Sequence, residues 1–186
     1  MTAMIVGITG ASGIVYGIRL LEVLKTMGIA RHLIMTPAAR ITLVHETDRK
    51  LSEVLALADA VYEPGNLAGA PASGSFPTLG MIVAPCSIKT LSAIACGITD
   101  NLLTRAADVT LKERRRLVLM VRESPLHLGH LRSMAAVTEM GAIVAPPMPA
   151  FYDRPQSVAA IVEHSVGRVL DLFGLDAGTF RRWGAD

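Results

Sequence analysis

The chain of 186 residues has little of several features that define special classes of protein. Aromatic residues make up only 4% of it, and its two cysteines are too few for a disulfide framework or a zinc cluster. A formal net charge of +2 does not by itself predict nucleic-acid binding. The longest uncharged window, residues 64–88, is interrupted by glycines and prolines and therefore does not predict a membrane span.

The N-terminal residues lack a basic segment followed by an apolar run, so no signal peptide is expected and a cytoplasmic location is predicted. Aliphatic residues are abundant instead. Hydrophobic residues make up 51% of the chain and charged residues 18%, which predicts one folded domain over residues 1–186. Its core must be built from Leu, Ile, Val, Met and Ala.

Short apolar runs alternate with helical patterns along the whole chain. Strands are predicted at residues 4–8, 32–35, 80–84, 117–121 and 142–145. Helices are predicted at about 14–27, 87–96, 103–114, 126–140 and 156–173, with another beginning at Pro37. Residues 46–53 form a polar stretch and residues 62–78 a long loop. The alternation predicts a three-layer α/β fold, Rossmann- or flavodoxin-like, with a mainly parallel sheet and helices on both faces.

Ligands of such sheets bind beyond the carboxyl ends of the strands, so the residues that follow each strand matter most. The turn Thr9-Gly10-Ala11-Ser12-Gly13 follows the first strand and begins a helix, which is an arrangement that binds anions. It is shorter than the dinucleotide fingerprint GxGxxG, so it favours a mononucleotide or a single phosphate. An ordinary tight turn between strand and helix is the alternative.

Hydroxyl and cationic side chains follow the next two long strands. Thr36 precedes Pro37 at a helix start, where it favours a helix cap and could also donate a hydrogen bond to a phosphate. Ser87 and Thr90 can cap the helix after residues 80–84 and present hydroxyls to a ligand, while Lys89 adds a positive charge. Helix capping beside a solvated lysine remains the simpler interpretation.

The last two predicted strands end in residues of a different chemistry. Arg122 and Glu123 directly follow a run of apolar residues. A surface salt bridge between them is the alternative, but a functional role is favoured because Arg suits bidentate contacts with phosphate. A proline-rich segment would present Tyr152, unless it is only a stiff linker. Arg168 stands beside an apolar helix stripe and either has a partner or extends to solvent. No metal-ligand spacing and no GxSxG motif is present in the sequence.

Taken in order, segments along nearly the whole chain resemble the flavin prenyltransferases of the UbiX type, long named aromatic-acid decarboxylase subunits. The segments of the N-terminal half are Thr9-Gly10-Ala11-Ser12-Gly13, Glu46-Thr47-Asp48, Pro71-Ala72-Ser73-Gly74-Ser75 and Pro85-Cys86-Ser87-Ile88-Lys89-Thr90-Leu91-Ser92. Those of the C-terminal half are Arg105-Ala106-Ala107-Asp108-Val109, Leu111-Lys112-Glu113-Arg114-Arg115, Arg122-Glu123-Ser124-Pro125, Phe151-Tyr152-Asp153-Arg154-Pro155-Gln156-Ser157 and Arg182-Trp183-Gly184.

The resemblance implies a metal-independent prenyltransferase. Such enzymes join a dimethylallyl group, usually from dimethylallyl monophosphate, to N5 and C6 of reduced FMN. The prenylated flavin then serves a partner decarboxylase of the UbiD type. The resemblance also implies a homo-oligomer, a dodecamer with sites at subunit junctions, and no nucleic-acid or membrane partner.

The resemblance also assigns roles to single residues. It assigns FMN contacts to Ala11, Ser12, Gly13, Thr36, Ser87, Ile88, Lys89, Thr90 and Arg122. It assigns the prenyl phosphate to Lys112, Arg122, Tyr152 and Arg168, and it places Ser12, Glu46 and Glu123 near the reacting flavin edge as catalytic groups. Thr36 stands where many members carry Ser, which keeps the hydroxyl.

Two other functions are compatible with parts of the sequence. A flavin-dependent decarboxylase acting directly on an aromatic acid or a cysteine peptide would use a base histidine, and His45 lies near its expected place. The substrate segment Pro-x-Met-Asn of the cysteine-peptide enzymes is replaced by Pro147-Met148-Pro149-Ala150, which lacks the Asn. A non-catalytic nucleotide-binding subunit would leave Lys112, Arg122 and Arg168 unexplained.

Overall fold

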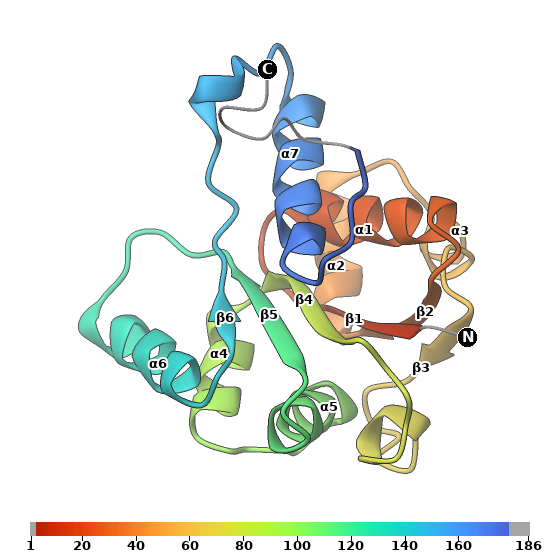
Figure 1. Cartoon of the computed structure of the whole chain (residues 1–186), viewed down its shortest axis with the longest axis vertical. Coiled ribbons are helices and arrows are strands. Elements are labelled where there is room, and N and C mark those ends of the chain that lie inside the picture. The colour runs from red at the N-terminus through yellow and green to blue at the C-terminus, as the bar shows by residue number, and fades with distance from the viewer. Residues whose placement is uncertain (1–2, 179–186) are drawn as a thin grey trace.

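The computed structural model describes residues 3–178, which form one parallel sheet covered by helices on both faces (Figure 1). The strands are β1 (Ala3–Ile8), β2 (Ala30–Met35), β3 (Ala60–Tyr62), β4 (Gly80–Cys86), β5 (Arg116–Val121) and β6 (Ile143–Val144). The helices are α1 (Ile14–Thr26), α2 (Pro37–Glu46), α3 (Leu51–Leu55), α4 (Ile88–Ala95), α5 (Leu102–Lys112), α6 (Leu128–Glu139) and α7 (Val158–Asp171), with short 3-10 helices η1 (Ala70–Ala72) and η2 (Phe151–Asp153). The strand order is β3-β2-β1-β4-β5-β6, and every neighbouring pair is parallel.

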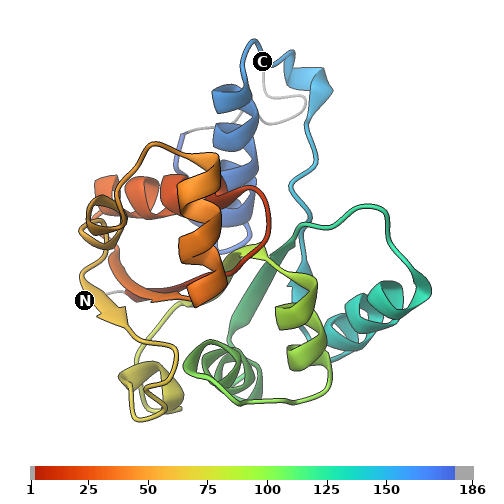
Figure 2. The same ribbon diagram turned by 180° about the vertical axis from the view of Figure 1, so that it is seen from behind.

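Alternate side chains of each central strand point into two separate cores. In β1, Met4, Val6 and Ile8 pack with α1, α2 and α7, whereas Ile5 packs with α4, α5 and α6. Figures 1 and 2 show the same division, with α1, α2 and α7 on one face of the sheet and α4, α5 and α6 on the other. The predicted three-layer α/β fold is therefore confirmed.

Helix α1 lies very close to the end of β4. A Cβ atom at Gly17 would come within 2.3 Å of the Ala84 carbonyl oxygen and 2.8 Å of Ile8 Cδ1. The residue at this position must therefore be glycine for α1 to keep its place. This contact fixes the start of α1, and with it the glycine-rich turn, against the carboxyl edge of the sheet.

Two short elements differ from the sequence prediction. The polar stretch contains α3, whose start is stabilised by a hydrogen bond of 3.0 Å from Lys50 N to Glu53 Oε2. The predicted loop after residue 62 is preceded by the edge strand β3, which pairs through three residues with β2. Among residues 3–178, no helix is both long enough and apolar enough to cross a membrane.

Candidate functional site

A cavity of about 600 Å³ opens where the strand order reverses, between β1 and β4. From β1 the chain continues to one half of the sheet, and from β4 it continues to the other, so the loops that follow these two strands diverge and leave a crevice. The volume suits a small cofactor. The lining residues are Thr9, Gly10, Thr36, Pro37, Ala38, Pro64, Ser87, Ile88, Lys89, Thr90, Asp100, Asn101 and Glu123.

Two helix N-termini face this cavity. Thr36 caps α2 by accepting a hydrogen bond of 3.3 Å from Ala39 N, and Ser87 caps α4 by accepting one of 3.3 Å from Thr90 N. The predicted caps are therefore present. Ile88 and Lys89 are the first residues of α4 and line the cavity. Their backbone N–H groups have no carbonyl partner within the helix, as is usual in a first helical turn. Such an arrangement of helix N-termini and hydroxyl groups can bind an anion such as a phosphate monoester.

The side chain of Thr9 holds the connection between β4 and α4 in place. It is only 1% exposed. Its hydroxyl donates to the Pro85 carbonyl oxygen at 2.8 Å and accepts from Ser87 N at 2.7 Å. The sequence places Thr9 in the glycine-rich motif but does not indicate this role, since its partners lie more than 70 residues away in the chain.

The N-terminus of α1 already holds an anion from the protein itself. Glu46 Oε2 accepts hydrogen bonds from Gly13 N at 2.8 Å and from Ile14 N at 3.0 Å. Gly13 is the N-cap and has a φ of 96°, a conformation that favours glycine. The sequence predicts a mononucleotide or a single phosphate at this turn, whereas in the structure the Gly13 and Ile14 N–H groups bind the carboxylate of Glu46.

The surroundings of Glu46 keep its carboxylate ionised. Burial by itself raises the pKa of Glu46. The hydrogen bonds from Ser12 and from the Ile14 and Gly13 N–H groups lower the pKa, as does the positive charge of Arg122, and these effects outweigh burial. A carboxylate in this state can accept a proton at neutral pH but has none to donate. The structure thus brings Ser12, Glu46 and Arg122 together.

Tyr16 connects this group to α7 and is a residue that the sequence reasoning missed. Burial raises the pKa of Tyr16, against the effects of a hydrogen bond with Ser165 of α7 and of the positive charge of Arg122. Its ring also packs against the turn, because a Cβ atom at Gly13 would lie 2.9 Å from Tyr16 Cδ2. Only the packing of α1 on α7 brings these residues together, so no sequence spacing could have indicated them.

A second cavity, of about 400 Å³, lies between α7 and the segment that follows β6. Tyr152, His164, Ser165 and Arg168 provide its polar lining. The Tyr152 hydroxyl and His164 Nε2 are 3.1 Å apart, and the Arg168 guanidinium pairs with Asp171. The structure therefore places Tyr152 and Arg168 in one cavity, and Ser165 of the same cavity forms a hydrogen bond with Tyr16 of α1.

Lys112 does not line either of the two cavities described above. It ends α5, four residues before β5 begins at Arg116, so it lies near the amino end of that strand, whereas Arg122 follows the carboxyl end. Its ammonium group pairs with Glu113, and it lines a cavity of about 490 Å³ together with Asp108. One copy of the chain does not bring Lys112 to the other predicted site residues.

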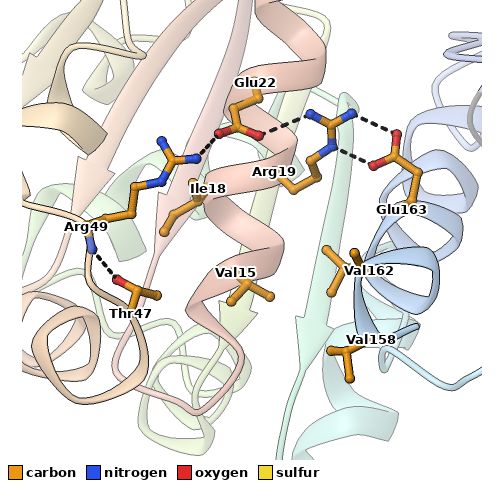
Figure 3. A pocket seen from close by; sticks show the side chains of 10 residues that line it. Val15, Ile18, Arg19, Glu22, Thr47, Arg49, Val158, Val162 and Glu163 are labelled. Carbon is orange, nitrogen blue, oxygen red and sulfur yellow. Dashed lines mark hydrogen bonds and ion pairs between the residues drawn. The ribbon is translucent and has the colours of Figure 1, made fainter.

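A third region, the groove between α1 and α7, has no residue that the sequence predicted for the site (Figure 3). Val15, Ile18 and Val162 give this cavity of about 560 Å³ an apolar wall. Arg19 crosses it and pairs with Glu163 at 2.5 Å. The charged side chains that line this groove form ion pairs with one another, through Arg19, Glu22, Arg49 and Glu163. Within residues 3–178, no group of three or more His, Cys, Asp or Glu side chains is placed to hold a metal ion.

Comparison with known proteins identifies the family. Residues 1–170 match the family model described as Flavoprotein. The chain is 57% identical over 186 residues to the flavin prenyltransferase UbiX of Escherichia coli, with 98% of each protein covered. The chain belongs to the flavin prenyltransferase family.

Two solved structures place this flavin prenyltransferase chain among its relatives. The crystal structure of AnUbiX in complex with FMN and dimethylallyl pyrophosphate has a TM-score of 0.97 and 49% identity, covering 100% of this chain and 98% of that one. A dodecameric FMN-dependent UbiX-like decarboxylase from Escherichia coli has a TM-score of 0.96 and 49% identity, covering 99% and 100%. The described residues 3–178 thus have the fold of these relatives.

Proposed function

We propose that this chain joins a dimethylallyl group from dimethylallyl monophosphate to N5 and C6 of reduced FMN. The observation that carries the proposal is the cavity between the ends of β1 and β4, where two helix N-termini and the side chains of Thr36, Ser87 and Thr90 surround a space suited to a phosphate monoester. Support also comes from the AnUbiX structure, which holds both FMN and a dimethylallyl donor.

In this proposal the FMN phosphate lies between α2 and α4 rather than at the start of α1, which Glu46 already fills. The residues that hold the FMN phosphate are then Thr36, Ser87, Ile88, Lys89 and Thr90. Ala11, Ser12 and Gly13 border the flavin from the side of α1, and Arg122 does so from the end of β5.

The prenyl phosphate belongs, in the same proposal, beside Tyr152, Arg168 and Arg122. Breaking the allylic C–O bond leaves negative charge on the phosphate, and two guanidinium groups and a hydroxyl stabilise that charge. Reduced FMN supplies the electron-rich N5 and C6 atoms. No divalent cation is needed where protein cations neutralise a monophosphate.

The protons of the reaction must also be accounted for. As the two new C–N and C–C bonds form and phosphate leaves, N5 and C6 each lose a proton, and the central alkene carbon of the prenyl group gains one. Glu46 fits a proton acceptor because it is ionised, and Ser12 fits a hydrogen-bonding partner that orients it. Glu123 lines the FMN cavity and is the second candidate acceptor.

Lys112 enters the proposed site from a second copy of the chain. Lys112 ends α5 and Arg168 lies on α7, and these two helices cover opposite faces of the sheet, so the two residues lie apart within one copy. One relative is a dodecamer, and we propose the same assembly here, with the partner subunit's Lys112 beside the prenyl phosphate. Mixing separately inactive Glu46→Gln and Lys112→Ala proteins after dissociation is expected to restore part of the activity. If assemblies that contain both variants recover no activity, each active site takes Glu46 and Lys112 from the same chain, and the proposed role of the partner subunit is wrong.

The product recipient and the cellular location complete the proposal. Prenylated FMN is proposed to pass to a decarboxylase of the UbiD type, which would use it as a cofactor. The location proposed is the cytoplasm.

The decisive experiment is anaerobic incubation of the purified protein with reduced FMN and dimethylallyl monophosphate, followed by mass measurement of the flavin. The expected product is heavier than FMN by one C5H8 unit. Parallel incubations with an aromatic acid or a cysteine peptide test the decarboxylase alternative. Unmodified FMN together with release of CO2 in the absence of a partner protein would establish that alternative instead.

A further inference from the structure

His164 is a buried titratable residue to which the proposed reaction gives no role. It is 8% exposed and lines the cavity that also contains Tyr152 and Arg168. His164 and Arg168 are separated by four residues on α7, so their side chains share one face of the helix. Tyr152 approaches that face from η2, with its hydroxyl 3.1 Å from His164 Nε2 and the two rings edge to face.

The direction of this hydrogen bond determines what Tyr152 offers to a ligand. A phenol has one O–H donor and a neutral imidazole has one N–H donor. If His164 Nε2 accepts, the single Tyr152 proton points at the imidazole and the phenol oxygen turns only lone pairs toward the cavity. If Nε2 carries a proton and donates, the Tyr152 O–H can point at a ligand, which is the arrangement that an anion requires.

We propose that His164 is a positioning residue for the prenyl phosphate, donating from Nε2–H to the Tyr152 oxygen so that the Tyr152 hydroxyl donates to the phosphate. The inference rests on the proposed function for the identity of the anion. Arg168, on the same face of α7, supplies the charge for that anion, and His164 sets the polarity of the neighbouring hydroxyl. In this arrangement the Tyr152 hydroxyl and the Arg168 guanidinium, which also pairs with Asp171, both favour an anionic group.

Two polar substitutions separate this role from simple packing. The amide nitrogen of Gln reaches about as far as Nε2 of histidine, whereas that of Asn reaches only as far as Nδ1. We expect His164→Asn to raise the KM for dimethylallyl monophosphate by about three- to tenfold, the range for losing one hydrogen bond. The Kd of FMN is expected to stay within about twofold of the wild-type value, and His164→Gln is expected to recover most of the loss.

A double-mutant cycle with Tyr152→Phe tests whether His164 acts through the tyrosine. In the Tyr152→Phe protein, His164→Asn is expected to add less than about a twofold change in KM. A matched control is available in the pair between His32 Nδ1 and the Tyr62 hydroxyl, 2.9 Å apart at the β2–β3 edge. Tyr62→Phe removes a hydroxyl from the same kind of pair outside both cavities and is expected to leave the KM unchanged.

The inference and the proposed function fail in different ways. If the wild-type protein prenylates FMN but His164→Asn has the wild-type KM, or if Gln and Asn raise it equally, the role of His164 is refuted and the function stands. If the wild-type protein makes no prenylated FMN, the proposed function falls. The binding of inorganic phosphate, measured by calorimetry, then tests the inference. His164→Asn must weaken phosphate binding when Tyr152 is present and leave phosphate binding unchanged in the Tyr152→Phe protein.

Discussion

Replacing Glu46 by Gln separates the structural role of this carboxylate from its proposed chemical role. Both backbone hydrogen bonds at the start of α1 go to the same oxygen, Glu46 Oε2, from Gly13 N at 2.8 Å and Ile14 N at 3.0 Å. The carbonyl oxygen of Gln can accept both. The substitution therefore removes the negative charge and leaves the cap of α1 in place.

The expected loss of stability is small. A carboxylate at a helix N-terminus contributes about 0.3–1 kcal/mol, and the exposure of Glu46 allows solvent to screen its attraction to Arg122, so about 1 kcal/mol in total is expected. Because the pKa of Glu46 is lowered in the folded state, this contribution is fully present above its unfolded pKa and is lost as the pH falls through the folded value. The difference between the two proteins should therefore be full at neutral pH, begin to shrink as the pH falls below the unfolded pKa of Glu, about 4.3, and vanish below the lowered pKa of the folded state.

The expected loss of activity is much larger. A positioned general base contributes about a hundredfold to ten-thousandfold in rate, so prenylation should slow by at least about a hundredfold while FMN remains bound. The assays are single-turnover flavin mass measurement, FMN titration, and urea unfolding at neutral and acidic pH. Glu139→Gln, at an exposed carboxylate near the end of α6, is the matched control. A Glu46→Gln protein that prenylates FMN within about threefold of the wild-type rate would refute the assignment of Glu46 as the base.

Three further predictions follow from the close contacts of the fold. Gly17→Ala puts a Cβ atom 2.3 Å from the Ala84 carbonyl oxygen and should lower the free energy of unfolding by at least about 1–3 kcal/mol in urea titrations, whereas Gly65→Ala, with open space around the new Cβ, should not. Burial raises the pKa of the Cys86 thiol to about 12, so Cys86 should resist thiol reagents at pH 8 until urea unfolds the protein, and fast modification of Cys86 in the native state would contradict its burial. Thr9→Val should weaken FMN binding by about tenfold in fluorescence titrations, with Thr9→Ser close to wild type, because only the valine leaves the partly buried Ser87 N–H of the α4 connection without its acceptor.

Most of the fold follows from the apolar pattern of the sequence. The five predicted strands correspond to β1, β2, β4, β5 and β6; the first four are runs of mostly buried residues bounded by turn residues, whereas β6 has only two residues, both partly buried. The edge strand β3 has three residues, and Val61 at its centre is exposed, so neither length nor periodicity distinguishes it from a loop. Helix α3 is likewise only five residues long and begins in a charged stretch.

The site could be predicted only where strand ends alone determine it. Thr36 and Ser87 follow strands directly, and the parallel sheet brings them to one cavity without further information. The bond from Gly13 to Glu46 spans 33 residues and depends on how α2 ends beside α1. The contact of Tyr16 with Ser165 depends on the packing of α1 against α7, which the sequence pattern does not specify.

The place of Glu46 at the start of α1 also has a consequence for the timing of proton transfer. The hydrogen bonds and the charge of Arg122 that lower its pKa make it a weak base before substrate binds. An anionic phosphate that pairs with Arg122 offsets that positive charge and brings a like charge toward the carboxylate, and both effects raise the pKa. A base is most effective when its pKa lies near the working pH. Binding of the prenyl phosphate would therefore strengthen Glu46 as a base at the moment when the flavin must lose a proton, and the free enzyme would keep the start of α1 stable with the same carboxylate.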